Sequence, residues 1–486
     1  MSHTLPYTIT VGLEVHVELS TKTKMFCRCL NNPFLAEKPN MYVCPVCLGL
    51  PGALPVPNKE AVRKTVLVGL ALNSELSRLS KWDRKHYFYP DLPKGYQISQ
   101  FDLPFCVGGS IDLLGEDGKV ASTVRFERAH LEEDAGKLQH GGKPGYSVVD
   151  LNRAGVPLLE MVTKPDITSA TQARQFLQEM QQLVRTLGVS DADMEKGQMR
   201  CDVNISIQFP ELTAAGLPHT PITEVKNVNS SRAVERSITT EAQRQYDEWM
   251  AGGPITKRTG KITVGWDENT ETVNLQRAKE GTADYRYMPE PDLPPVKVYE
   301  DPELNPETLR KTLPELPNAR KLRYVAAGIT VKDATTLMLD PSRLAAFDAA
   351  LALDPTKAKQ LANWLINADG ASSFAPNDLL ELVQLAEAGE VSFSAVKPKL
   401  PLILEKVSGG STLRDTISTL GLLQVHNEAV VQSAVAAVLA EHASVVADYK
   451  AGNEKVFGFL VGQAMRKAAG GAQPAKLQEA LREALK

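Results

Sequence analysis

The chain has 486 residues, of which 43% are hydrophobic and 23% charged, and its formal net charge is -4. This composition is typical of well-packed soluble enzymes and argues against a protein that binds nucleic acid over its whole surface. Because one core rarely serves so long a chain, we expect two to four domains. The sequence shows neither a signal peptide nor an apolar run of about 18 residues, so we expect a cytoplasmic protein without a membrane segment.

The segment 9–19 alternates apolar and polar residues and predicts a β-strand. Glu14, His16 and Glu18 share its polar face. Two carboxylates and an imidazole this close together suit a divalent cation. The alternative is an ordinary half-buried antiparallel strand with a polar outer face.

Four cysteines form two close pairs, Cys27 with Cys29 and Cys44 with Cys47. This spacing predicts a zinc knuckle over residues 27–47, in which four thiolates close a tetrahedral structural site. A redox Cys-x-x-Cys pair is the alternative, but such a pair would open a helix, and Gly49, Pro51 and Gly52 break the chain just after Cys47.

Further ionisable residues lie on predicted strands. Residues 200–207 alternate strictly, which places Arg200, Asp202 and Asn204 on one polar face, and Lys226 lies on the polar face of 223–229. The stretch 125–134 is dense in ionisable groups, and Glu160 ends an apolar run. Together these segments predict one inner sheet surface that handles magnesium and phosphate. No P-loop, dinucleotide fingerprint or protein-kinase loop is present, so ATP would bind in an unfamiliar fold.

The domain organisation follows from changes in composition. Up to about residue 295 the chain is rich in strands and turns, with one long helix over 176–187 that Thr168 or Ser169 can cap. Closely spaced prolines from Pro289 to Pro306 predict a linker, and helical periodicity follows. A second break at Pro398–Ser411 precedes a helical tail. We therefore predict an α+β protein with a mostly antiparallel sheet domain (1–295), a helical domain (296–405) and a small helical tail domain (406–486).

The tail differs from the rest of the chain in charge, because residues 406–486 hold nine Lys and Arg against seven Asp and Glu. Lys455, Arg466 and Lys467 lie near its end and could contact phosphates. A solvated helix face would explain the same residues.

Several long motifs closely resemble the B subunits of bacterial aspartyl/glutamyl-tRNA amidotransferases, and the likeness runs nearly from end to end. They are the cysteine pairs, Val11–His16, Lys85–Gln100, His130–Lys137, Asp150–Glu160, Met199–Asn204, Glu224–Ser230 and Val456–Met465. The resemblance implies an ATP-dependent carbon–nitrogen ligase that uses glutamine as the amide donor. Its catalytic domain would be a cradle that phosphorylates the side-chain carboxylate of Glu-tRNA(Gln) or Asp-tRNA(Asn) and then lets ammonia displace phosphate.

The resemblance also implies partners and site residues. Ammonia would come from the amidase, the A subunit of a heterotrimer in which a small C subunit holds the other two together, with ATP, Mg²⁺ and Zn²⁺ as cofactors. We expect magnesium at Glu14, His16, Glu133 and Glu160. We expect phosphate or carboxylate contacts from Lys85, Arg153 and Lys226, ATP contacts from Arg200, Asp202 and Asn204, and tRNA contacts from Lys455, Arg466 and Lys467. The choice between Glu132 and Glu133 depends on a strand phase that the sequence leaves open.

Two alternatives belong to other classes. A zinc-containing tRNA-binding scaffold without chemistry would not need the Glu14 and His16 face. A free-standing ligase that joins a small carboxylate to an amine would not need the tail. The chain carries both features, which favours the tRNA-dependent ligase.

Overall fold

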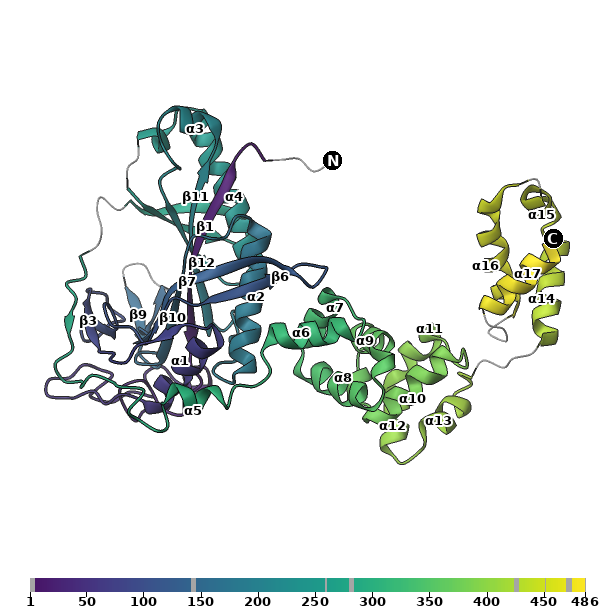
Figure 1. Ribbon diagram of the computed structural model, residues 1–486, viewed down its shortest axis with the longest axis horizontal. Helices are drawn as coiled ribbons and strands as arrows, with labels where there is room; N and C mark the ends of the chain where they lie inside the picture. Colours follow the sequence, from purple (N-terminus) through teal and green to yellow (C-terminus); the bar gives the residue numbers. More distant parts are fainter. Residues whose placement is uncertain are drawn as a thin grey trace. The chain divides into compact units, whose positions relative to one another are not determined.

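The computed structural model describes residues 5–140, 146–257, 260–278, 284–423, 428–450, 452–468 and 474–485. The chain forms two compact units, Met1–Arg320 and Lys321–Lys486. The first contains the sheets, and the second is helical (Figure 1). The predicted α+β class, a mostly antiparallel sheet domain followed by helices, is confirmed.

A large sheet forms the centre of the first unit. Its strands are β1 (Thr8–Glu18), β2 (Glu75–Leu76), β5 (Cys106–Val107), β6 (Ser110–Leu114), β7 (Val120–Glu133), β10 (Pro157–Thr163), β11 (Met199–Gln208), β12 (Thr223–Val228), β13 (Ile262–Asp267) and β14 (Thr272–Ala278). In the described residues their order is β14-β13-β12-β11-β1-β10-β7-β5-β2, and β6 pairs with β7. The pairs are antiparallel, except that β12 and β13 are parallel.

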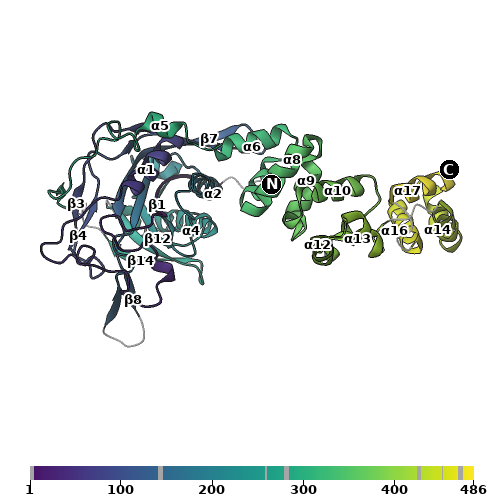
Figure 2. The same cartoon turned by 90° about the horizontal axis from the view of Figure 1, so that it is seen from below.

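Within the described part of the chain, two smaller sheets accompany it. One joins β3 (Asp83–His86), β4 (Tyr96–Ser99) and β15 (Met288–Pro289), and the other is the hairpin of β8 (Lys137–His140) and β9 (Ser147–Asp150). Figure 2 shows β3 and β4 on one side of β1, and the helices α2 (Ala170–Thr186) and α4 (Ser231–Met250) on the other.

The alternation in β1 decides which face of the sheet is buried. Val11, Val15 and Val17 are fully buried in the core that also contains the apolar side chains of α2, α4 and α1 (Lys59–Ala71). The predicted strand and the predicted long helix are therefore confirmed. Ser169 caps α2 by accepting a hydrogen bond from the backbone N–H of Gln172. The polar side chains of β1 consequently point away from the helices, towards the face where β3 and β4 lie.

The proline-rich segment that predicts a linker packs onto the first unit. Leu293, Val298 and Leu304 belong to its core, and Val296 bridges Ser80. The unit also contains two short helices, α3 (Pro210–Ala214) and α5 (Pro306–Arg310), the second of which follows the proline-rich segment. The prolines exclude regular structure here without detaching the segment, because extended chain can still bury alternate side chains.

Two separate hydrophobic cores organise the helices that follow. Their helices are α6 (Pro317–Ala326), α7 (Val331–Met338), α8 (Pro341–Leu353), α9 (Ala358–Asn367), α10 (Pro376–Glu387), α11 (Phe393–Val396), α12 (Leu400–Ser408), α13 (Leu413–Thr419), α14 (Glu428–Glu441), α15 (Ala443–Lys450), α16 (Phe457–Ala468) and α17 (Pro474–Leu485). The first core includes residues from Tyr324 to Ile417, and the second includes residues from Ala434 to Leu485.

The predicted break at Pro398–Ser411 contains α12. Pro401 lies in the first turn of this helix, where the missing N–H has no intrahelical partner to lose. The helix spans the expected start of the tail at residue 406, and Leu413 and Ile417 after it still pack into the first helical core. A truncation that spares this core therefore has to begin at α14.

Among the described residues, no single helix combines the length and the apolar character needed to cross a membrane. Together, the apolar stretches Val430–Glu441 and Ala443–Lys450 reach that length, but they meet at an angle of 90°.

Candidate functional site

Five neighbouring strands carry polar side chains on the face of the sheet opposite the helices. The register places His16 beside Glu160 on one side and Arg200 on the other, and places Glu14 beside Asp202. We call this surface the polar face; its side chains come from β12, β11, β1, β10 and β7. Since residues paired across antiparallel strands point to the same side, groups far apart in the sequence meet here.

The first cluster on the polar face consists of His16, Glu132 and Glu160, whose nearest ligand atoms all lie within 4.8 Å of one another. His16 Nε2 lies 3.3 Å from Glu160 Oε2, and His130 Nε2 lies 3.5 Å from the same oxygen. Burial raises the pKa of Glu160, but His130, His16 and Lys85 outweigh it and hold that pKa well below its usual range. Two carboxylates and an imidazole at this spacing are a ligand set for a divalent cation.

Lys85 approaches this cluster from β3. Its ammonium lies 5.3 Å from the centre of the Tyr285 ring. Burial lowers the pKa of Lys85, yet the charges of Glu132 and Glu160 outweigh burial and raise it above its ordinary value. Lys85 therefore remains a cation beside two carboxylates, as a group that neutralises phosphate must.

A second cluster lies farther along the polar face and consists of Glu14, Asp202 and Glu224. The amide of Asn204 donates to Glu14 Oε1 at 3.0 Å. Lys226 forms an ion pair with Asp202 and lies 3.9 Å from Glu224 Oε1. Three carboxylates with a lysine at their edge can hold a cation and face an anion at the same time.

Glu224 accepts a hydrogen bond at 2.8 Å from the hydroxyl of Thr263 in β13 and one at 2.9 Å from Lys261, the residue before that strand. Burial raises the pKa of Glu224, but Lys226 and Lys261 outweigh it and lower it to about 2, from an ordinary value of 4.5. Its contribution to stability is therefore complete above pH 4.5 and is lost as the pH falls towards 2.

We therefore expect Glu224→Gln to lose less stability than the unmodified protein between pH 6 and pH 3, because the glutamine has no proton to take up. Urea unfolding midpoints at the two pH values measure this difference. Glu116→Gln, the same change at an exposed position, should lose as much stability as the unmodified protein. Equal losses for Glu224→Gln and Glu116→Gln would contradict the assignment.

Arg153 and Arg200 meet at the end of the polar face on the carboxylate of Asp134. Arg200 forms an ion pair with it, and Arg153 Nε lies 3.5 Å from Asp134 Oδ2. Arg153 also donates to the carbonyl oxygens of Ala135 and Gly136. Burial and the charge of Asp134 raise the pKa of the neighbouring Glu18 to about 8.

The structure divides the predicted magnesium set. His16 and Glu160 lie together with Glu132, and Glu14 lies in the second cluster. Glu133 forms an ion pair with Lys94 and accepts a hydrogen bond from the backbone N–H of Ile98. The predicted set omits Glu132, His130 and Glu224, which the structure brings to these clusters. Arg128, His130 and Glu132 alternate with the apolar Ala129 and Leu131. This alternation is the sequence signal that could have shown that Glu132, and not Glu133, shares the polar side of the strand with His130.

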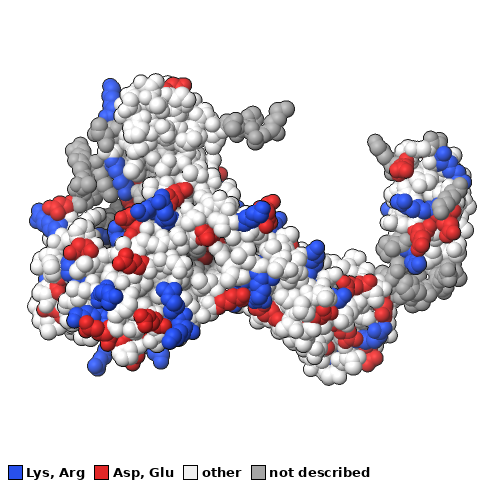
Figure 3. All heavy atoms as spheres, in the orientation of Figure 1, with Lys and Arg blue, Asp and Glu red and all other residues white. Residues whose placement is uncertain are grey.

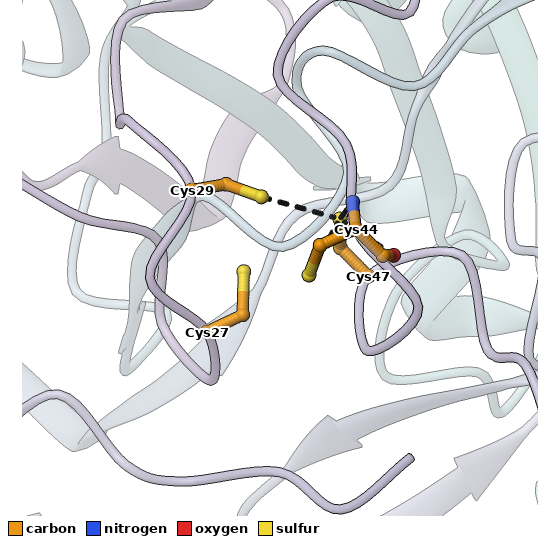
Figure 4. Close-up of side chains that lie close together, drawn as sticks. All are labelled: Cys27, Cys29, Cys44 and Cys47. Carbon is orange, nitrogen blue, oxygen red and sulfur yellow. Dashed lines mark hydrogen bonds between the residues drawn. The ribbon is translucent and has the colours of Figure 1, made fainter.

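The four cysteines of the predicted knuckle lie together, Cys27 and Cys29 from one loop and Cys44 and Cys47 from the turn that faces it (Figure 4). Their sulfur atoms are all within 4.8 Å of one another, and Cys29 Sγ lies 4.0 Å from Cys47 Sγ. A tetrahedral zinc–thiolate site with bonds of about 2.3 Å has sulfurs about 3.8 Å apart. A hydrogen bond from Cys27, with help from Lys24, lowers the pKa of Cys47 to about 5. The cluster can therefore bind a metal such as zinc.

In the tail, Arg466 and Lys467 are exposed residues in the last turn of α16. Lys467 forms an ion pair with Glu441. The side chain of Lys455 lies outside the described residues. Figure 3 shows Lys and Arg interspersed with Asp and Glu on the visible face of the first unit. The charges on that face therefore do not form a single basic surface.

Comparisons with known proteins agree over the whole chain. The family model of the GatB/GatE catalytic domain matches residues 9–302, and that of the GatB domain matches residues 346–485. Relatives named as the B subunit of aspartyl/glutamyl-tRNA(Asn/Gln) amidotransferase include those of Thermomicrobium roseum, 43% identical, and Persephonella marina, 44% identical. The first match covers 99% of both chains, and the second covers 98% of this chain and 99% of its relative. The relative of the same name from Thermus thermophilus is 43% identical, with 99% of both chains covered.

Proposed function

Because the chain belongs to the family of B subunits of aspartyl/glutamyl-tRNA(Asn/Gln) amidotransferases, we propose that it activates the side-chain carboxylate of a mischarged tRNA with ATP. The substrate is Glu-tRNA(Gln), Asp-tRNA(Asn) or both. Ammonia, supplied by the amidase, or A subunit, of a cytoplasmic heterotrimer that also contains the small C subunit, then gives the amide. The chain is the carbon–nitrogen ligase of the complex.

The observation that carries this proposal is the pair of carboxylate clusters side by side on the polar face. His16, Glu132 and Glu160 would hold one Mg²⁺, and Glu14, Asp202 and Glu224 would hold the cation that accompanies ATP. Bound Mg²⁺ would neutralise phosphate charge and let two anions approach each other. A scaffold that only binds tRNA would have no use for six such residues buried or half-buried on one face.

The reaction needs an activated acyl group, because a free carboxylate has no leaving group that ammonia can displace at neutral pH. An oxygen of the side-chain carboxylate attacks the γ-phosphorus of ATP, and ADP leaves. Ammonia then attacks the acyl carbon, and phosphate departs with the oxygen that came from the carboxylate. Lys85 beside Glu132 and Glu160 would balance the charge of the transferred phosphoryl group.

Other predicted residues would take supporting roles. Lys226 at the edge of the second cluster and Asn204 on Glu14 would orient ATP and its cation, and Arg200 closes the other end of the polar face. Arg153, held on Asp134, would contact the substrate carboxylate from that end. In the knuckle, zinc would close the four-thiolate site and stabilise the fold.

The test is an amidation assay with the reconstituted heterotrimer. Of radiolabelled Glu-tRNA(Gln) and Asp-tRNA(Asn), at least one should be converted to the amide, and only when ATP is present, with ammonium chloride as the nitrogen source. Amidation without ATP would refute carboxylate activation, and no amidation of either tRNA would refute the proposed substrates.

We further propose that the tail after residue 428 binds tRNA. Arg466 and Lys467 are exposed on α16, and a Cβ added at Gly458 or Gly462 would meet no heavy atom within 4 Å. The phosphates of an RNA backbone can approach closely where side chains are small and cations lie nearby.

Deletion of residues 428–486 should raise the KM for charged tRNA by about tenfold or more, with a smaller effect on kcat, because these contacts are the same in the ground and transition states. The glutaminase activity of the complex is the control, since it does not require tRNA. An unchanged KM would refute the role of the tail, and the deletion at 428 keeps the helical core around Leu413 and Ile417 intact.

A further inference from the structure

The cysteine knuckle touches Lys94 through a glycine. Gly49 lies in the turn that follows Cys47 and has φ of +67°. A Cβ at this position would lie 2.6 Å from Cγ and 3.1 Å from Cα of Lys94. Real Cβ atoms do not come so close to other atoms, so the backbone of the knuckle rests directly on Lys94.

A second glycine, Gly155, lies between Cys47 of the knuckle and Glu133. Gly155 has φ of +86°, and a Cβ there would lie 3.6 Å from Cβ of Cys47 and 3.9 Å from Oε2 of Glu133. Its N–H donates to the carbonyl oxygen of Asp134 at 2.8 Å, and its carbonyl accepts from Met25 N at 2.7 Å. The loop at Gly155 is thus enclosed between the knuckle and the end of β7.

Lys94 connects the knuckle to β7. Its side chain is 11% exposed and forms an ion pair with Glu133, whose side chain is 5% exposed. A buried lysine on a buried carboxylate is costly to displace, because either charge would be left unpaired. The position of Lys94 therefore fixes the position of Glu133.

Strand β4 is hydrogen-bonded to Glu133 and to the neighbouring Glu132. Glu133 Oε1 accepts from Ile98 N at 3.0 Å, and Glu133 O accepts from Gln97 Nε2 at 2.6 Å. The hydroxyl of Ser99 donates to Glu132 Oε2 at 3.0 Å. Glu132 is the member of the first cluster that comes from β7. A continuous series of contacts therefore connects the cysteine knuckle to that cluster, through Lys94, Glu133 and β4.

The geometry points to a second role for the knuckle: it positions Lys94 on Glu133, and through β4 it orients Glu132 in the cluster of His16 and Glu160. This inference rests on the proposed function, in which that cluster holds Mg²⁺. Lys94 and Gly49 are positioning residues, since neither belongs to the cluster. Groups that orient a metal ligand commonly change metal affinity or activity by about 10- to 100-fold when they are removed.

Gly49→Ala tests the contact, and Gly52→Ala is its matched control. Gly52 lies in the same loop with φ of +81°, but a Cβ there would meet no heavy atom within 4 Å. Both substitutions place a Cβ on a residue with positive φ, and only the first presses on Lys94. We expect both variants to keep the zinc content of the unmodified protein, and Gly49→Ala alone to raise the Mg²⁺ concentration for half-maximal amidation by about tenfold.

Hydrogen exchange at Ile98 gives a readout that is independent of amidation, because this amide is bonded to Glu133. In the heterotrimer, exchange at Ile98 should be faster in Gly49→Ala and in protein stripped of zinc by a chelator, and unchanged in Gly52→Ala. Lys94→Met, which removes the charge and leaves all four cysteines, should speed exchange in the same way.

Equal exchange at Ile98 and equal Mg²⁺ dependence in Gly49→Ala and Gly52→Ala would overturn the inference. So would normal exchange in Lys94→Met. A complex that never amidates tRNA but shows the expected exchange pattern would refute the proposed function and leave the coupling of knuckle and glutamates standing.

Discussion

Glu160→Gln is expected to lower ATP-dependent amidation by about 10³-fold, a loss of the size seen when a group that stabilises developing charge is removed. Glu160 is the centre of the first cluster, with His16 at 3.3 Å and His130 at 3.5 Å from one carboxylate oxygen. Glutamine keeps the shape of the side chain but cannot supply the negative charge that holds these groups and a cation. Amidation should be measured in the heterotrimer at saturating ATP and tRNA.

Two controls separate chemistry from folding. Glutaminase activity of the same complex should remain, because it takes place in the amidase. Glu127→Gln, the same change at an exposed position of β7, should amidate as well as the unmodified protein, since Glu127 pairs with Lys164 at 3.5 Å, away from the cluster. Near-normal amidation by Glu160→Gln would show that this cluster is not required for the reaction.

The second large effect concerns the cysteines. Cys44→Ser should reduce the zinc content from about one per chain to nearly none and should lower the free energy of unfolding of the first unit. A ligand present at about 1,000 times its Kd stabilises the folded state by about 4 kcal/mol, and loss of the metal removes that contribution. Metal analysis and thermal unfolding of the reduced protein measure the two effects.

Cys106→Ala is the control for this substitution. Cys106 is fully buried away from the knuckle, so the variant should keep its zinc and lose only about 1 kcal/mol for the small cavity. Stoichiometric zinc in Cys44→Ser, or unfolding at the same temperature with and without zinc, would contradict a structural metal site.

Hydrophobic periodicity predicted the elements that have one apolar, buried face and one polar face. Strands β1 and β11 and helix α2 are of this kind, because their sequences record directly which side meets the core. Helix α1 is buried on nearly all sides and therefore shows no period. Helix α4 buries Glu241 and Gln245, which bond to each other, and Gln245 also bonds to Thr220 and Thr223, so the inner face of α4 resembles an outer one.

The polar face was predictable as a surface but not as two clusters. Alternation places Glu14 and His16 on one side of a strand, whereas the pairing of β1 with β10 and β11 decides that His16 meets Glu160 and that Glu14 meets Asp202. That register depends on turns and loops across the whole sheet. Lys85 reaches its place only because β3 and β4 fold over the polar face, which no local pattern records.

The proposal that this chain forms an acyl phosphate is tested most directly by isotope transfer. Glu-tRNA(Gln) carrying ¹⁸O in both side-chain carboxylate oxygens is amidated by the heterotrimer with ATP and ammonium chloride, and the inorganic phosphate is analysed by mass spectrometry. We expect one ¹⁸O atom in each phosphate released per amide formed, because the carboxylate oxygen leaves with the phosphoryl group. Phosphate without ¹⁸O, released while the amide accumulates, would contradict the formation of an acyl phosphate.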